Sequence, residues 1–262
     1  MTYSLEGRTA LVCGSTQGIG RACAVAMARQ GAAVTVMARN EERLRKVQGE
    51  LATDHGQSHG CVVADFADWQ QVRARVQEYV GQSGPIHILL NNTGGPPAGP
   101  LFEAEPENLV KAFSQHILCN EVLAQATAPG MRDEGYGRII NIISSSVVIP
   151  IKGLGISNVT RGAVANWART LAGELGPFGI TVNNILPGYV ATARLESLIQ
   201  SWAGRDGISA DEVEKKLIAT IPLGRLASPE EIGSVAAFLA SPAASYVNGV
   251  NMPVDGGRLA RQ

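Results

Sequence analysis

Short apolar runs alternate along the chain with longer segments of helical period. The apolar runs are nearly continuous and rich in β-branched residues, a pattern typical of strands that are covered on both faces. They predict strands at residues 9–13, 33–38, 60–64, 86–91, 139–144, 181–186 and 250–254. The segments between them predict helices near residues 19–30, 41–52, 69–80, 107–132, 158–175 and 229–240. Repeated alternation of strand and helix indicates βαβ units with right-handed crossovers, and therefore an α/β fold built on a parallel sheet.

Two segments interrupt this alternation. Residues 94–100 are Gly-Gly-Pro-Pro-Ala-Gly-Pro, a composition that excludes a helix and predicts a loop after the fourth strand. Residues 193–225 form a long insertion after the sixth strand, with short helices expected near 194–202 and 210–219. Both segments follow the carboxyl ends of strands, where open α/β sheets bind their ligands. Because the sequence holds no internal repeat, linker or low-complexity segment, we expect a single domain over residues 1–262.

The turn after the first strand is rich in glycine, with Gly14, Gly18 and Gly20 leading directly into a helix. Glycines allow a tight turn there and let the backbone approach a pyrophosphate at the N-terminus of the helix. The turn could instead be a tight connection that binds nothing. Its place at the first βα junction of an alternating chain favours a bound dinucleotide. The residues expected to contact the dinucleotide are Gly14, Ser15, Thr16, Gln17, Gly18, Ile19 and Gly20.

The end of the second strand bears on the identity of the dinucleotide. NAD-binding folds place an acidic side chain near this point, about 20 residues beyond the glycine loop, where it binds the ribose hydroxyl. This chain has Ala-Arg-Asn at residues 38–40 instead. A guanidinium at Arg39 suits a 2′-phosphate, so the sequence favours NADP(H) over NAD(H). The alternative is a solvated arginine, which is common at a strand end.

Composition and charge exclude several classes of function. The 22 Lys and Arg against 23 Asp and Glu give a net charge of -1, unlike the basic surface that nucleic-acid binding requires. No apolar run approaches the roughly 18 residues that span a bilayer, and the first residues lack the pattern of a signal peptide. The four cysteines stand apart, with no spacing typical of a metal site or a disulfide framework. We therefore expect a cytoplasmic protein that binds no nucleic acid, membrane or metal.

Several separate motifs stand in order along almost the whole chain, namely Gly14-x-x-x-Gly18-Ile19-Gly20, Asn91-Asn92-Thr93-Gly94, Pro187-Gly188-Tyr189-Val190-Ala191-Thr192 and Val254-Asp255-Gly256-Gly257. Together they resemble the short-chain dehydrogenase/reductase family, particularly its 3-oxoacyl-[acyl-carrier-protein] reductase branch, although Cys13 stands where that family usually has Thr. The resemblance implies a Rossmann-like doubly wound fold, a seven-stranded parallel sheet with helices on both faces, a nicotinamide cofactor and usually a homotetramer. It also implies that the cofactor is contacted by Asp65, Asn92, Pro187, Gly188 and Thr192.

The catalytic residues that the resemblance implies are a Ser, a Tyr-x-x-x-Lys on the following helix and an Asn on the helix before. Ser144 stands at the serine position. The register of Arg-Thr-Leu-Ala at residues 169–172 places Ser157 at the tyrosine position and Arg161 at the lysine position. His116 stands at the asparagine position. This chain therefore departs from the family's pattern at three of the four positions.

These substitutions change the acid–base chemistry. Reduction of a carbonyl leaves an alkoxide that must be protonated, which a tyrosine with a lowered pKa does well and a serine does poorly near neutral pH. Loss of a general acid typically lowers a rate about 10²–10⁴-fold. Arg161 stays cationic and can bind the nicotinamide ribose, but it cannot shuttle protons as lysine does. Ser157 or Asn158 could alternatively be the N-cap of the helix predicted at 158–175.

Three other side chains could supply the missing proton or charge. The imidazole of His116 titrates near neutral pH, although a histidine within a long helix is more often a packing residue. Tyr189 follows the Pro-Gly turn beside the expected cofactor, where it could act as an acid or simply line the pocket. Lys152 lies between Ser144 and Ser157 and could bring a positive charge or be solvated.

Two functions from different classes fit these residues. The first is an NADP(H)-dependent oxidoreductase that interconverts a ketone and a secondary alcohol, with a small molecule or a 3-oxoacyl thioester as its substrate. The second is a catalytically impaired relative that binds a dinucleotide as a sensor or structural subunit. A different reaction on the same scaffold, such as dehydration or isomerisation, is the weaker third alternative. We expect a homo-oligomer, a tetramer or a dimer, in each case.

Overall fold

The computed structural model describes residues 2–260, and all seven predicted strands are present in it. The strands are β1 (Thr9–Cys13), β2 (Ala33–Ala38), β3 (Gly60–Val63), β4 (Ile88–Asn91), β5 (Gly137–Ile142), β6 (Ile180–Pro187) and β7 (Asn251–Val254). They form one parallel sheet in the order β3-β2-β1-β4-β5-β6-β7. The order reverses direction between β1 and β4, which makes this pair the switch point of a doubly wound sheet. The predicted fold class is confirmed.

The helices connect these strands largely where the hydrophobic pattern predicts them. They are α1 (Gly18–Arg29), α2 (Glu41–Glu50), α3 (Trp69–Ser83), α4 (Pro106–Phe113), α5 (Cys119–Asp133), α6 (Gly155–Leu175), α7 (Ala193–Asp206), α8 (Ala210–Ile218) and α9 (Pro229–Ala240). Short turns of 3₁₀ helix occur at Ser145–Val147, Gly176–Phe178, Pro242–Ala244 and Arg258–Ala260. The helix predicted over 107–132 is present as one helical run, in which a π-helical turn, Ser114–Leu118, separates α4 from α5.

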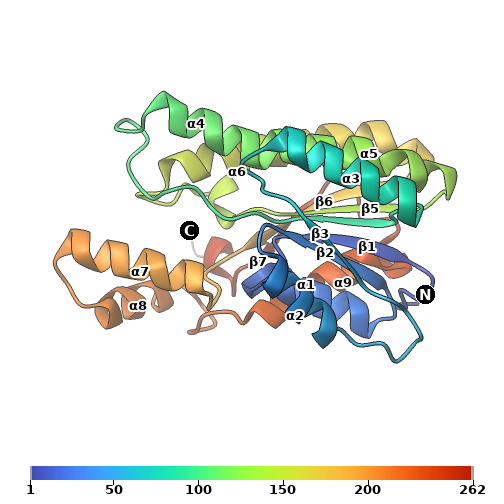
Figure 1. The fold of residues 1–262 in the computed structure, drawn as a ribbon. Helices are drawn as coiled ribbons and strands as arrows, with labels where there is room; N and C mark the ends of the chain where they lie inside the picture. The colour runs from blue at the N-terminus through green and yellow to red at the C-terminus, as the bar shows by residue number, and fades with distance from the viewer. Residues whose placement is uncertain (1, 261–262) are drawn as a thin grey trace.

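Helices cover both faces of the sheet, as Figure 1 shows. On one face α1, α2 and α9 bury an apolar cluster that contains Met27 of α1 and Leu44 of α2. On the other face α3, α5 and α6 bury a second cluster, with Val72 of α3 and Leu123 of α5. These four side chains are fully shielded from solvent. Burial on both faces explains why the strands are nearly continuous in apolar residues.

A row of four asparagines, three of them buried and one half-buried, crosses strands β4 to β7 of the sheet. Asn91, Asn141, Asn184 and Asn251 occupy paired positions on β4, β5, β6 and β7. The Nδ2 of each donates to the Oδ1 of the next, at 2.8, 2.9 and 2.8 Å. Side-chain amides can form such a chain because each carries both donors and an acceptor. The row fixes the register of four strands next to the carboxyl edge.

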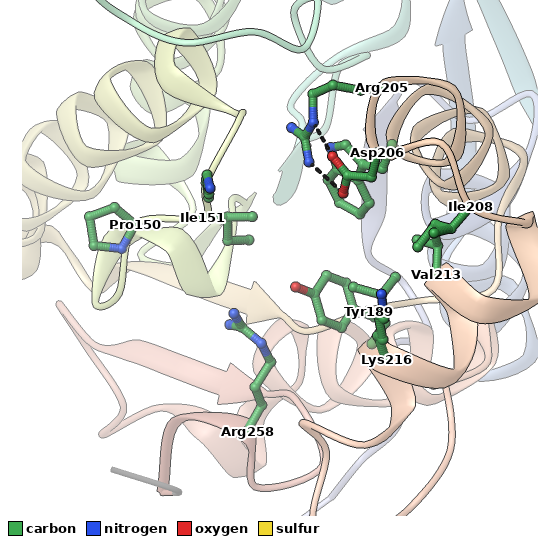
Figure 2. A pocket seen from close by; sticks show the side chains of 12 residues that line it. Pro150, Ile151, Tyr189, Arg205, Asp206, Ile208, Val213, Lys216 and Arg258 are labelled. Atoms are coloured by element: carbon green, nitrogen blue, oxygen red, sulfur yellow. Dashed lines mark hydrogen bonds and ion pairs between the residues drawn. The ribbon is translucent and has the colours of Figure 1, made fainter.

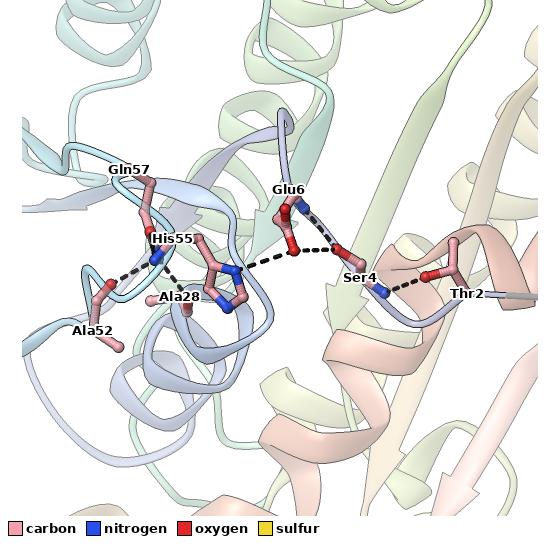
Figure 3. A network of polar contacts seen from close by, with 7 residues as sticks. All are labelled: Thr2, Ser4, Glu6, Ala28, Ala52, His55 and Gln57. Carbon is pink, nitrogen blue, oxygen red and sulfur yellow. Dashed lines mark hydrogen bonds and ion pairs between the residues drawn. The ribbon is translucent and has the colours of Figure 1, made fainter.

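A separate polar network ties down the opposite edge of the sheet (Figure 3). His55 Nδ1 lies 3.1 Å from Glu6 Oε1, and Gln57 Nε2 donates to the carbonyls of Ala28 and Ala52 at 2.9 and 2.8 Å. Residues 2–6 precede β1 and residues 52–57 precede β3, so this network lies at the amino ends of the strands. It anchors the scaffold away from the carboxyl edge.

The insertion predicted at 193–225 contains α7 and α8, which extend beyond the carboxyl edge of the sheet in Figure 1. Their shared apolar cluster includes Leu198, Trp202 and Val213, together with Leu154 from the loop before α6. A capping box between Ser209 and Glu212 begins α8. No helix within residues 2–260 is long and apolar enough to cross a membrane.

The asparagine row makes a testable contribution to stability. Asn141→Ala removes the acceptor of Asn91 and the donor of Asn184, and both remaining amides stay buried. We expect the free energy of unfolding to fall by about 2–4 kcal/mol, since each buried polar group without a partner costs about 1–3 kcal/mol. Urea denaturation measures the change. Asn166→Ala on the exposed face of α6 is the matched control, and equal losses in the two variants would contradict the structural role of the row.

Candidate active site

The glycines of the loop after β1 are packed so tightly that Gly14 and Gly20 have no room for a side chain. Gly14 and Gly18 have φ of 58° and 54°, a conformation that favours glycine. A Cβ on Gly20 would collide with the carbonyl oxygen of Gly14 and lie 2.7 Å from Asn92 Nδ2. Asn92, which follows β4, donates from Nδ2 to the carbonyls of Gly14 and Cys13 at 3.2 and 3.3 Å. The switch point therefore presents bare backbone at the start of α1.

The other predicted loop residues divide into anchors and open positions. Ser15 is buried, and its Oγ accepts a hydrogen bond of 3.0 Å from the Met37 N–H of β2, so its side chain holds the loop to the sheet. Ile19 packs its side chain against the core. Thr16 is half-buried and Gln17 is exposed at the N-cap of α1. Only Thr16 and Gln17 therefore have side chains available to a ligand, while Ser15 and Ile19 have only backbone to offer.

The turn after β6 contains two of the other predicted cofactor contacts, Gly188 and Thr192. The Gly188 N–H donates to the Val254 carbonyl at 3.0 Å, and a Cβ on Gly188 would lie 2.8 Å from the Cα of Asp255. Thr192 caps α7 by accepting from the Leu195 N–H at 3.3 Å. A Cβ on Gly18 would lie 3.3 Å from the Thr192 methyl carbon. The structure thus brings Thr192 next to the glycine loop and the predicted Pro187-Gly188 turn next to the end of β7.

Arg39 and Asp65 lie just beyond the carboxyl ends of the neighbouring strands β2 and β3. Arg39 is exposed, and within residues 2–260 its guanidinium has no ion pair or side-chain hydrogen bond. Asp65 is half-buried, and its Oδ1 accepts from the Ala67 N–H at 3.0 Å. Both residues therefore lie at the part of the carboxyl edge where the adenosine of a dinucleotide would lie in a doubly wound sheet.

Ser144 lies outside the strand to which it was assigned. β5 ends at Ile142, two residues earlier than predicted, and Ser144 is the N-cap of the 3₁₀ turn that follows. Its Oγ accepts a hydrogen bond of 3.0 Å from the Ser146 N–H. A capping serine is held in one place while its hydroxyl proton stays free to donate, as hydrogen bonding to a substrate oxygen would require.

Ser157 lies within the first turn of α6, because the helix begins at Gly155, three residues earlier than predicted. The alternative that Ser157 or Asn158 is the N-cap is therefore wrong. Leu154 is the N-cap residue, and Asn158 instead bonds the Ile151 backbone, donating to its carbonyl at 3.0 Å. Ser157 and Arg161 are one turn apart on α6, as their spacing predicts.

Arg161 carries a buried positive charge without an acidic partner in the described residues. One guanidinium nitrogen, Nη1, donates to the Ile142 carbonyl at the end of β5, at 3.0 Å. Burial, and then the nearby charge of Arg194, lower the pKa of Arg161 to about 10. The guanidinium is still protonated at neutral pH, and unmatched buried charge is a feature of sites that bind anions or developing negative charge.

His116 lies in the π-helical segment and is almost fully buried, at 1% exposure. Its Nδ1 is 2.7 Å from Thr93 Oγ1, whereas its Nε2 is buried with no partner in the described part of the chain. Burial, and then the charge of Arg161, hold the pKa of His116 well below its usual range. The imidazole is therefore neutral near pH 7, which weakens its candidacy as a cationic acid.

A pocket of about 250 Å³ is lined by Tyr189, by the loop at residues 150–152 and by residues of α7 and α8. Figure 2 shows Tyr189 and Arg258 projecting into it, with the ion pair of Arg205 and Asp206 across the space. Lys152 and Tyr189 both line it, as the sequence suggested for Tyr189. The remaining polar residues could not be found by motif, since the only signal was their place in or after the 193–225 insertion.

The residues at this edge of the sheet fit a nicotinamide dinucleotide. They include bare backbone at the start of α1, where a pyrophosphate would approach, an exposed guanidinium at Arg39 and a buried cation at Arg161. Gly14, Gly18 and Gly20 would hold the pyrophosphate, with Arg39 at a 2′-phosphate and Arg161 at the ribose. These roles stay predictions, as do those of Asp65 and Thr192.

The role of the glycine loop, here called the glycine cradle (Gly14, Gly18 and Gly20), can be tested at Gly20. Gly20→Ala places a methyl group against the Gly14 carbonyl and Asn92, so the loop must move. We expect the dissociation constant for NADPH to rise about 10-fold or more, equivalent to about 1.4 kcal/mol, in a fluorescence titration. Gly49→Ala on α2, where the added methyl meets nothing within 4 Å, is the control and should bind like the wild type. Unchanged affinity in Gly20→Ala, with the fold intact by circular dichroism, would argue against the cradle.

The buried His116 predicts a pH dependence of stability. Because its pKa is lowered in the folded state, the unfolded chain takes up the proton first as pH falls below about 6.5. The stability due to neutral His116 is thus present above that pH and lost below it. We expect His116→Asn to lose less stability than the wild type between about pH 7.5 and about pH 5.5 in urea denaturation. Equal losses of stability in the wild type and in His116→Asn over this pH range would refute the assignment.

Comparison with known proteins agrees with this geometry. A family model described as enoyl-(acyl carrier protein) reductase matches residues 14–258. The NADPH-dependent reductase BacG of Bacillus subtilis is 30% identical over 256 residues, which cover 97% of this chain and 99% of that protein. Gluconate 5-dehydrogenase of Gluconobacter oxydans is 34% identical over 255 residues, covering 97% and 96% of the two chains.

Solved structures show the same likeness. L-Sorbose reductase from Gluconobacter frateurii, in complex with NADPH and L-sorbose, superimposes with a TM-score of 0.91 and 32% identity, covering 99% of each chain. BacG is named as NADPH-dependent and L-sorbose reductase was solved with NADPH bound, in agreement with the cofactor expected from Arg39. The chain therefore belongs to the short-chain dehydrogenase/reductase family of oxidoreductases.

Proposed function

We propose that the protein is an NADP(H)-dependent oxidoreductase that interconverts a ketone and a secondary alcohol. The observation that carries this proposal is the glycine loop at the β1–β4 switch point, where Gly14 and Gly20 leave no room for a side chain. The same edge of the sheet carries the buried cation of Arg161, and the serines Ser144 and Ser157 lie at the starts of the neighbouring helical segments. The relatives that are named as NADPH-dependent reductases support it. The exposed guanidinium of Arg39 supports NADPH over NADH.

The residues around the carbonyl would act by orientation and charge. When bound, NADPH supplies the hydride that reduces the carbonyl carbon. Ser144 and Ser157 donate hydrogen bonds to the substrate oxygen, and the positive charge of Arg161 stabilises the negative charge that develops there. Arg161 also holds the ribose through the N–H groups that Ile142 does not use. Neither serine is acidic enough to supply the proton readily, so we assign the proton to solvent or to Tyr189 at the pocket.

The substrate is less well constrained than the cofactor. The description of the matching family model names an enoyl thioester of acyl carrier protein, so it supports an acyl thioester as the substrate without supporting the 3-oxo group. Relatives named for gluconate and L-sorbose support a small polar molecule instead. The pocket of about 250 Å³ is small beside the ~300–1,000 Å³ typical of drug-sized ligands, and it favours the small molecule.

The second candidate function is binding of a dinucleotide without turnover. Two observations favour it, namely the loss of the Tyr-x-x-x-Lys pair and the lowered pKa of His116, which leaves the site without a strong general acid. Such a protein would still bind NADPH through the glycine cradle. Tight binding without reduction of any of a broad panel of carbonyl compounds would favour this function.

A homo-oligomer remains part of the proposal. Exposed apolar side chains on and beside α4 and on α6 would be covered by a second copy of the chain, as monomers rarely expose large contiguous apolar patches. They are Phe102, Val110, Phe113, Leu118 and Val159.

Restoring the family's residues should raise the rate of carbonyl reduction. Ser157→Tyr with Arg161→Lys installs a phenol whose pKa of about 10 can be lowered by the adjacent ammonium, so we expect a gain of about 10-fold or more. Consumption of NADPH, followed by its absorbance over a panel of ketones, measures the rate. Ser157→Phe with Arg161→Lys is the matched control, since it adds the ring without the hydroxyl. Equal rates for the two double variants, with NADPH binding intact, would contradict the assignment of Ser157 to the acid position.

A further inference from the structure

The pocket beside Tyr189 carries an excess of positive charge. Its lining includes four cationic side chains, Lys152, Arg205, Lys216 and Arg258, but only one acid, Asp206. That acid is committed to Arg205, whose Nε and Nη2 donate to its two carboxylate oxygens at 2.7 and 3.1 Å. The other three cations have no ion pair within the described residues. Charge complementarity therefore calls for an anion in this space.

Two buried donors in the same lining also lack an acceptor. Trp202 is 7% exposed, and its Nε1–H has no hydrogen-bond partner among residues 2–260. The Nε–H of Arg258 is likewise buried without a partner. Buried donors are nearly always satisfied in folded proteins, and leaving them unsatisfied is unfavourable. The walls of the pocket therefore hold two donors that the described residues leave unsatisfied.

The pocket is connected to the residues proposed to act on the carbonyl. Arg258 Nη1 donates to Ser145 Oγ at 3.3 Å, and Ser145 directly follows Ser144. Arg258 also lies over the Tyr189 ring, 5.0 Å from its centroid. On the opposite side Ile151, which lines the pocket, is bonded to Asn158, the neighbour of Ser157. A substrate could therefore reach from the carbonyl site into this pocket.

We propose that this pocket binds a carboxylate of the substrate, so that the protein acts on small oxo acids and hydroxy acids. The inference rests on the proposed oxidoreductase function and adds the substrate class. A carboxylate suits the planar fork of Arg258 and the ammonium groups of Lys152 and Lys216. A single negative charge on a short carbon chain also matches the mixed lining better than a doubly charged, strongly hydrated phosphate, since Ile208, Val213 and Leu217 share the pocket.

The test compares acids with their uncharged esters. Straight-chain oxo acids from acetoacetate to oxooctanoate, each with its methyl ester, are assayed for NADPH-dependent reduction and for binding by calorimetry to the NADPH-loaded protein. We expect the wild type to prefer the best acid over its ester about 10-fold or more, and Arg258→Met and Lys216→Met to lose most of that preference. Lys215→Met is the matched control, because Lys215 is the exposed neighbour of Lys216 on α8 and does not line the pocket. It should keep the wild-type preference.

The outcomes separate this inference from the proposed function. Preferential binding of acids without reduction would support the carboxylate site and contradict the oxidoreductase proposal. Equal binding and reduction of acids and esters would overturn the carboxylate site while supporting the oxidoreductase. Preference for a phosphorylated ketone such as dihydroxyacetone phosphate over every oxo acid would also overturn it. A preference for acids that survives in both Arg258→Met and Lys216→Met would place the anion elsewhere and overturn the assignment.

Discussion

The close approach of the loops after β1 and β4 is the constraint on which the site depends. Asn92 bridges the carbonyls of Cys13 and Gly14, and Gly20 lies so near them that a Cβ has no room. This contact holds the first turn of α1 against the switch point of the sheet. The asparagine row and the two apolar clusters support this contact, because they fix the positions of the strands from which the loops emerge.

The electrostatics of the site follow from what is buried there. Arg161 remains charged at neutral pH even though burial lowers its pKa to about 10, whereas the same burial keeps His116 neutral. On the proposed assignment, these two residues stabilise negative charge and supply no strong acid. The cationic side chains that line the pocket beside Tyr189 add positive charge on the side of the insertion.

Local patterns were sufficient for the fold, but not for the details of the site. Periodicity located all seven strands, because strands buried on both faces are apolar throughout. Periodicity missed the π-helical segment at His116, whose imidazole contacts the distant Thr93. It also missed the start of α6 before Ser157, where the residues at the start of the helix pair with the distant Gly99. The asparagine row and the approach of Arg258 to Ser145 join residues far apart in sequence, so no local motif could reveal them.

The central claim is that the glycine loop and Arg39 bind a phosphorylated nicotinamide dinucleotide. A fluorescence titration of the purified protein with NADPH, and separately with NADH, tests it most directly. The account predicts micromolar binding of NADPH, tighter than that of NADH by about 10-fold or more because Arg39 adds a charge-assisted contact to the 2′-phosphate. Absence of binding by either dinucleotide would contradict it.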